Sequence, residues 1–250
     1  MERSLLTEYL SDQLKSALGL LRKIEGDGEP DDIHQFRVSI RRIRSLLRLY
    51  GEDIPPFPVE IKQFVQKTNS VREIDVLLSL IRPDKYPKTF KRLRNLRKKQ
   101  YRLSFDPTAL QKITVLVQHY DEKLSRSDPK SEPLRWIALA ETNYRIARIG
   151  YQSLSKKTPQ KELHALRIRF KIARYALEFI DKSGLKGENE KIAECKVLQE
   201  RLGAVQDTFN QLIWLKKIYR KKLIDEIRTL TRKREKSIKK LKKLEFPLNR

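Results

Sequence analysis

The feature of this sequence that most restricts its fold is a segment that occurs twice. Residues 33–47 (IHQFRVSIRRIRSLL) align without a gap with residues 163–177 (LHALRIRFKIARYAL). The same register, continued toward the N-terminus, pairs Lys15 with Arg145. Within the segment the matched pairs are His34 with His164, Arg37 with Arg167, Arg41 with Lys171, Arg44 with Arg174 and Leu47 with Leu177. Because repeated segments form repeated structural units, the sequence predicts two similar halves related by a pseudo-two-fold axis.

Helices are the predicted building blocks of both halves. Only 8 glycines and 11 prolines occur in 250 residues, and they cluster between long segments in which apolar residues recur every three or four positions. This spacing is typical of amphipathic helices, so we predict an all-α protein. The halves are expected at residues 1–126 and 127–250, with the boundary in the polar segment 125–133. The predicted helices cover residues 4–24, 33–50, 59–81, 89–103, 107–125, 134–154 and 161–180, followed by one that ends near Gly203 and a last one over 205–244.

Each copy of the repeat carries a cationic stripe beside its apolar face. In the first copy, steps of three and four residues place these side chains on one face of the helix: His34, Arg37, Arg41, Arg44 and Arg48. Arg42 adds to this charge, whereas Ile172 takes its place in the second copy. Stacked cations repel one another unless anions lie between them. Since arginine binds phosphate oxygens in pairs and lysine supplies a point charge, two facing stripes predict a phosphate-binding groove.

The overall charge also indicates an anionic partner. The chain has 56 Lys and Arg against 32 Asp and Glu, a formal net charge of +24. Such an excess opposes compaction, and nucleic acid, polyphosphate or an anionic membrane surface would offset it. No run of about eighteen apolar residues predicts a membrane span, and the N-terminus does not resemble a signal peptide. The single cysteine, Cys195, is expected to be a small buried hydrophobe, which fits a cytoplasmic protein.

These segments resemble the CHAD family, the conserved-histidine α-helical domain. The resemblance rests on I33HQFRVSIRRIR, L163HALRIRFKIAR and a second recurring signature at N69SVREIDVLL and L202GAVQD. It implies two four-helix bundles in pseudo-two-fold arrangement around a basic central groove or pore. It also implies binding of inorganic polyphosphate and association with polyphosphate granules. The implied binding residues are His34, Arg37, Arg41, Arg44, His164, Arg167, Lys171 and Arg174, to which the register and the stripe add Lys15, Arg145, Arg42 and Arg48. The second signature is degraded, because Phe209 stands where the first half has Asp75.

Nucleic-acid binding is the main alternative that the sequence leaves open. Residues 91–102 and 232–243 are strongly basic and would suit a phosphate backbone. No helix-turn-helix, zinc-finger or RNA-recognition signature accompanies them, and Trp136 and Trp214 are predicted to lie in the core rather than to stack on bases. A membrane-surface role for the basic C-terminal tail, and a duplication that kept no function, are two further alternatives.

Catalysis is not predicted. A phosphotransfer enzyme would need a phosphate-cradling glycine-rich loop or clustered acidic metal ligands, and the sequence has neither. Glu73, Asp75 and Asp207 are the only acidic residues at recurring positions, and capping of helices or pairing with Arg72 or Arg201 would account for them. His119 has no counterpart in the repeat. We therefore predict a non-enzymatic polyphosphate-binding protein without cofactor or metal.

Overall fold

The computed structural model describes residues 4–25, 28–127, 130, 132–218 and 224–245. In the described residues every regular element is an α-helix, which confirms the predicted all-α class. The helices are α1 (Leu5–Glu25), α2 (Pro30–Tyr50), α3 (Val59–Lys67), α4 (Asn69–Leu78), α5 (Pro87–Ser104), α6 (Pro107–Ser125), α7 (Pro133–Gln152), α8 (Gln160–Lys182), α9 (Asn189–Ile218) and α10 (Ile224–Glu245).

Local signals set several of the helix starts. Asp106 caps α6 by accepting hydrogen bonds from the backbone N–H groups of Thr108 and Ala109, and a proline occupies the first turn. Such caps satisfy N–H groups that have no partner inside the helix. The repeat-bearing helix α2 begins at Pro30, three residues earlier than predicted, because a capping box between Glu29 and Asp32 closes its first turn. The predicted break at residues 26–30 includes 26–27, which lie outside the described residues.

The predicted division into helices was wrong at one place in each half of the chain. The predicted helix over 59–81 is divided into α3 and α4 at Thr68, whose hydroxyl donates to the Val65 carbonyl. Conversely, α9 continues past Gly203, where a helix end was expected, and ends at Ile218. The predicted last helix over 205–244 is therefore divided between α9 and α10. Leu202 stands where the signature alignment places Thr68, so the second half has no hydroxyl at this point to compete for a backbone carbonyl.

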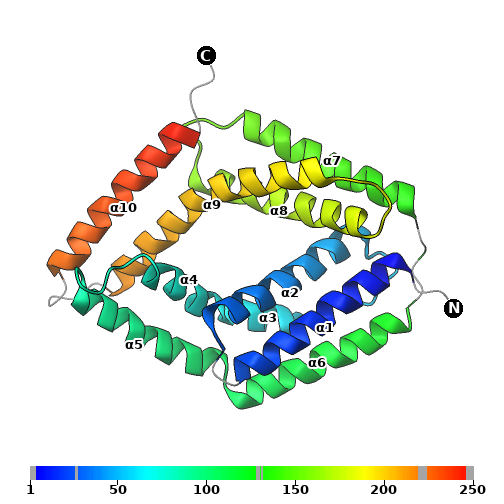
Figure 1. The fold of residues 1–250 in the computed structure, drawn as a ribbon, viewed down its shortest axis with the longest axis horizontal. Coiled ribbons are helices and arrows are strands. Elements are labelled where there is room, and N and C mark those ends of the chain that lie inside the picture. The colour runs from blue at the N-terminus through cyan, green and yellow to red at the C-terminus, as the bar shows by residue number, and fades with distance from the viewer. Residues whose placement is uncertain (1–3, 26–27, 128–129, 131, 219–223, 246–250) are drawn as a thin grey trace.

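The helices are arranged in a closed ring, in which spatial neighbours are not always consecutive in the sequence (Figure 1). Along this ring α6 packs on α1, α1 on α2, α7 on α8, α8 on α9 and α9 on α10, and α10 meets α5, which packs on α4. The two repeat-bearing helices, α2 and α8, contact each other directly, as do α4 and α9. The two copies of the repeat are therefore brought together although equivalent positions lie 130 residues apart in the sequence.

Two hydrophobic cores hold the ring. The larger core contains the apolar faces of α1, α2, α6, α7 and α8. Its centre includes the rings of Tyr50, Trp136 and Phe179, whose centroids lie 5.6–6.1 Å apart, and the Tyr50 hydroxyl donates to the Trp136 carbonyl. Full burial of such side chains contributes on the order of 2 kcal/mol each. The smaller core joins α4, α5, α9 and α10 around Leu93, Trp214 and Leu215.

Two expectations about buried residues are confirmed. Trp136 and Trp214 lie in the larger and the smaller core, respectively. Cys195 is fully buried, and burial raises the pKa of its thiol to about 12, so it behaves as a small apolar residue. Among the described helices, none is both long and apolar enough to cross a membrane.

Candidate functional site

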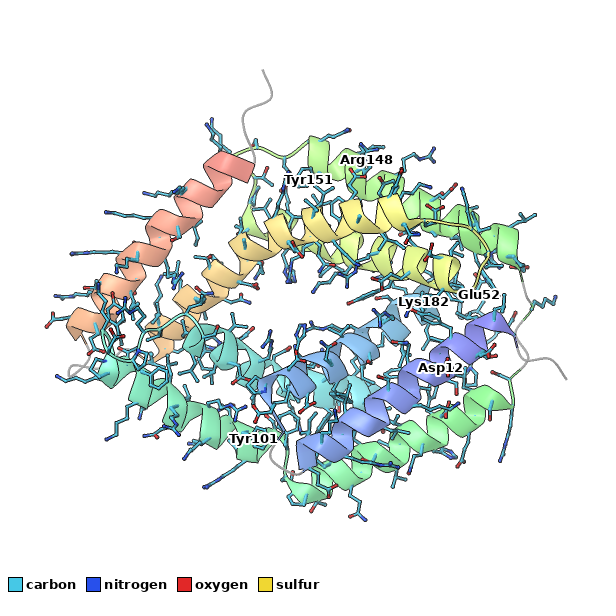
Figure 2. All side chains as sticks on the ribbon, viewed as in Figure 1. Asp12, Glu52, Tyr101, Arg148, Tyr151 and Lys182 are labelled. Atoms are coloured by element: carbon cyan, nitrogen blue, oxygen red, sulfur yellow. The ribbon has the colours of Figure 1, made fainter. Side chains whose placement is uncertain are left out.

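A cavity of about 560 Å³ lies where α2, α4, α8 and α9 meet. Both copies of the repeat and both copies of the second signature line it. Equivalent positions contribute in pairs: His34 and His164, Arg37 and Arg167, Arg41 and Lys171, Arg72 and Gln206, Glu73 and Asp207. Figure 2 shows side chains from these helices extending into the space enclosed by the ring. Seven Lys and Arg residues line the cavity against two Asp and Glu, so its electrostatic potential is strongly positive.

Arg37 is the most buried of these cations, at 3 % exposure. Its Nη1 donates to the Val65 carbonyl at 2.8 Å and to the Thr68 hydroxyl at 2.6 Å, and its Nη2 donates to Asn69 Oδ1. Burial, followed by the nearby charge of Arg41, lowers the pKa of Arg37 to about 9, which leaves it charged at neutral pH. Arg37 therefore joins α2 to the junction between α3 and α4.

Arg167, the counterpart of Arg37, has far fewer partners. Its Nη2 lies 4.0 Å from Asp207 Oδ1, and its buried Nε has no hydrogen-bond partner in the described structure. It packs against Gly203, where an added Cβ would come within 3.3 Å of Nε. The glycine thus lets a large cation lie close to the α9 backbone at the wall of the cavity.

Several cavity cations have no hydrogen bond or ion pair from their charged groups to the described residues. They are Arg41, Arg44, Arg48, Arg72 and Lys171. Burial lowers the pKa of Arg41 and of Arg44, and Arg167 acts as a further, unfavourable charge on Arg41. For Lys171, burial and the charges of Arg167 and Arg41 lower the pKa to about 7. Apart from Arg48, which is exposed, these cations are half-buried, so an anion that pairs with them gains more than it would at an exposed surface.

The two repeated histidines lie at one end of the cationic stripes. Burial lowers the pKa of His34, and the charge of Arg72 lowers it further. His164 is shifted in the same direction by burial and by Arg167, although a hydrogen bond with Gln206 partly offsets this. Both imidazoles are therefore neutral at pH 7 in the ligand-free cavity, and each can still donate one ring N–H to an anion.

The acidic residues at recurring positions have partners that the sequence did not reveal. Asp75 is 7 % exposed and pairs with Arg97 Nε at 2.8 Å, not with Arg72. Glu73 accepts a hydrogen bond from Trp214 Nε1 at 2.7 Å, which holds α9 on α4. These contacts leave Arg72 available to the cavity.

Four of the predicted binding residues lie outside the cavity lining. Arg42 donates to Gln13 and to Glu178, and Arg174 Nε lies 3.4 Å from the same Glu178 carboxylate. The two guanidinium groups lie 5.3 and 4.9 Å from the centroid of the Tyr175 ring. They connect α1, α2 and α8 instead of facing the cavity. Lys15 and Arg145 are exposed on the outer faces of α1 and α7.

The remaining eight predicted residues line the cavity together. They are His34, Arg37, Arg41, Arg44, Arg48, His164, Arg167 and Lys171. Sequence reasoning did not assign several further lining residues to the site, namely Asn69, Arg72, Tyr175, Gln206, Asn210 and Gln211. The weak second repeat could have indicated two of these residues, because the alignment of 70–73 with 204–207 pairs Arg72 with Gln206.

This arrangement is suited to holding several linked anions. The guanidinium groups offer planar pairs of donors, and the amide side chains at the wall add neutral donors. In the described part of the chain, no three His, Cys, Asp or Glu side chains are grouped as metal ligands would be.

Comparisons with known proteins agree with the helical fold. The family model of the CHAD domain matches residues 8–216, so the chain belongs to the CHAD family. Its fold is similar to the crystal structure of the CHAD domain from the plant Ricinus communis, with a TM-score of 0.76 and 18 % sequence identity. That match covers 100 % of this chain and 93 % of the plant chain. Comparison with curated proteins finds no match.

Proposed function

We propose that this protein binds inorganic polyphosphate in the cavity between α2, α4, α8 and α9. The observation that carries the proposal is the group of cations, including Arg41, Arg72 and Lys171, that line the cavity and whose charged groups have no hydrogen bond or ion pair with the described residues. Each internal phosphate of the polymer supplies about one negative charge. A bound chain would therefore release counter-ions, as nucleic acids do, and its affinity would fall steeply with salt.

The cavity favours a bare phosphate chain over nucleic acid. Single-stranded nucleic acid is usually held by large aromatic side chains that stack on its bases, and Tyr175 is the one Phe, Tyr or Trp among the lining side chains of the described structure. A rigid duplex presents its phosphates on a convex surface, which a cavity of about 560 Å³ cannot surround. A flexible phosphate chain meets neither obstacle.

The arrangement that we propose treats residues 1–126 and 127–250 as two pseudo-two-fold-related halves, each a four-helix bundle, with the basic groove between them. The direct contacts of α2 with α8 and of α4 with α9 support this arrangement. CHAD domains are generally non-catalytic binding domains, which supports binding without turnover. A cytoplasmic location at polyphosphate granules stays a prediction, which fluorescence imaging of the tagged protein would test.

The decisive experiment compares wild type with the double variant Arg41→Gln/Lys171→Gln. These positions are equivalent in the repeat and line the cavity. Calorimetric titration with long-chain and short-chain polyphosphate should show tight, length-dependent binding by wild type. Two lost charge-assisted hydrogen bonds should weaken the variant on the order of a hundredfold.

A matched control removes the same charge elsewhere. Arg22 and Lys112 are exposed on α1 and α6, so Arg22→Gln/Lys112→Gln lowers the net charge equally without touching the cavity. This control should bind polyphosphate within about twofold of wild type, since an exposed, distant charge is largely screened. Equal losses in the two double variants would overturn the proposal, because they would indicate diffuse attraction by net charge.

A further inference from the structure

The positive charge of this protein is concentrated at one end of the ring, away from the cavity. Helix α5 has eight Lys and Arg and no Asp or Glu, and α10 has nine Lys and Arg against four Asp and Glu. On the opposite side, α1 has three cations and three anions, and α6 has two of each. A protein that needed only solubility would have no reason to place more than half of its excess charge on two neighbouring helices.

Helix α5 places most of its apolar residues on one side and most of its cations on the other. Phe90, Leu93 and Leu96 pack into the smaller core, so this side of the helix is used by the fold. The exposed side carries Lys88, Lys91, Arg94, Lys98, Lys99 and Arg102. Neighbouring like charges on a helix destabilise it by about 0.2–0.5 kcal/mol per pair, and no acidic residue of α5 relieves them.

Specific contacts hold α10 beside α5. Glu226 accepts hydrogen bonds from the Thr89 backbone N–H and hydroxyl, at 2.8 and 2.6 Å. Lys233 Nζ donates to the Tyr86 hydroxyl at 3.0 Å. These bonds lie at the start of α5 and join the two helices at one corner of the ring, from which their long side chains project outward (Figure 2). The family match ends at residue 216, so α10 lies beyond it.

We infer that the outer face of α5 and α10 binds the phosphate backbone of double-stranded nucleic acid, independently of the cavity. Helix α5 extends about 27 Å, which lets its cations reach several successive phosphates along a duplex. A membrane surface fits less well, because amphipathic membrane binding needs an apolar face. On α5, where the exposure of every side chain is described, Leu103 is the one large apolar side chain exposed. Without base-reading elements the contact is independent of sequence.

The test uses a variant that removes charge from this face alone. Lys91→Gln/Arg94→Gln/Lys98→Gln changes three exposed residues of α5 and keeps good helix formers. Wild type should bind a labelled DNA duplex of about 30 base pairs without sequence preference. The variant should bind the duplex on the order of tenfold more weakly. The slope of the logarithm of its binding constant against the logarithm of the salt concentration should be smaller in magnitude by roughly 2 to 3. Its affinity for short-chain polyphosphate should stay within about twofold of wild type.

Two comparisons make the result decisive. The matched control Arg22→Gln/Lys112→Gln/Lys123→Gln removes three exposed charges from α1 and α6 and should retain duplex binding. The cavity variant Arg41→Gln/Lys171→Gln should also retain it. The inference is overturned if wild type binds no duplex, if the control loses as much affinity as the α5 variant, or if the cavity variant loses duplex binding. Failure of polyphosphate binding alone would leave this inference standing, since the two ligands use different residues.

Discussion

Arg37 and Arg167 occupy equivalent positions of the repeat, yet their surroundings differ. Arg37 is hydrogen-bonded to three acceptors at the α3–α4 junction, whereas Arg167 faces the cavity with one ion pair at 4.0 Å. The reason lies in the second signature: Thr68 and Asn69 supply acceptors in the first half, and Leu202 and Gly203 supply none in the second. The same motif therefore stabilises the fold in one half and can serve a ligand in the other.

The largest expected effect is a difference in protein stability between variants of these two arginines. Arg37→Ala removes two buried hydrogen bonds, to the Val65 carbonyl and the Thr68 hydroxyl, and a partly buried one to Asn69, which should lower the free energy of unfolding by about 3 kcal/mol. Arg167→Ala should change it by less than about 1 kcal/mol and instead weaken polyphosphate binding. Urea denaturation of both variants checks this. Equal losses of stability would show that the two positions are structurally alike.

The next effect concerns pH and contrasts Lys171 with Arg41, its counterpart. The pKa of Lys171 is lowered to about 7 in the ligand-free protein, and a bound polyanion favours its charged form. Affinity should therefore be highest below pH 7 and fall by up to about tenfold per unit as the pH rises above 7. The variant Lys171→Arg should flatten this profile, and Arg41→Lys should steepen it. Calorimetry from pH 6 to 9 measures it, and a flat wild-type profile would contradict the prediction.

The same pKa shift has a consequence for stability without ligand. The folded-state pKa of Lys171 lies below the value near 10.4 expected for an unfolded chain. The unfolded chain therefore binds more protons between these two values, and this group makes the protein more stable as the pH rises through that window. Lys171→Met should abolish this contribution, which denaturation at pH 7 and pH 9 would detect.

A smaller effect is expected at Gly203. Alanine there should stabilise α9 by up to about 1 kcal/mol, because glycine is a poor helix former. Its Cβ would lie 3.3 Å from Arg167 Nε and displace the guanidinium by a few tenths of an ångström. We expect polyphosphate affinity to fall about threefold while stability rises. If both quantities rise together, the close approach of Arg167 to the α9 backbone is not needed for binding.

The smallest effect is expected at Phe209, which occupies in the second half the position that Asp75 has in the first. Asp75 is buried and paired with Arg97, whereas Phe209 is 38 % exposed. Restoring the acidic residue with Phe209→Asp should change the free energy of unfolding by less than about 0.5 kcal/mol, as is usual for exposed sites. The matched change Asp75→Phe should cost several times more. Thermal unfolding of both variants would test whether the lost aspartate matters in the second half.

Much of the architecture could be predicted because helical periodicity and the repeat are properties of the chain itself. The apolar spacing predicted helices, and the gapless alignment of 33–47 with 163–177 predicted two equivalent cationic stripes. The division of α3 from α4 was missed because it depends on hydrogen bonds with Thr68 that come partly from another helix. Arg72 was missed because its repeat partner is Gln206, so the charge itself does not recur.

The sequence by itself determined which residues share a helix face, since a rise and turn of fixed size place every third and fourth side chain together. It thereby determined that His34, Arg41 and Lys171 belong to cationic stripes. Only the tertiary structure decided which cations remain without a partner. Arg37 finds its acceptors 28 to 32 residues away, and Arg42 pairs with Glu178, 136 residues away. Such pairings depend on how helices pack, and no periodicity within one helix specifies them.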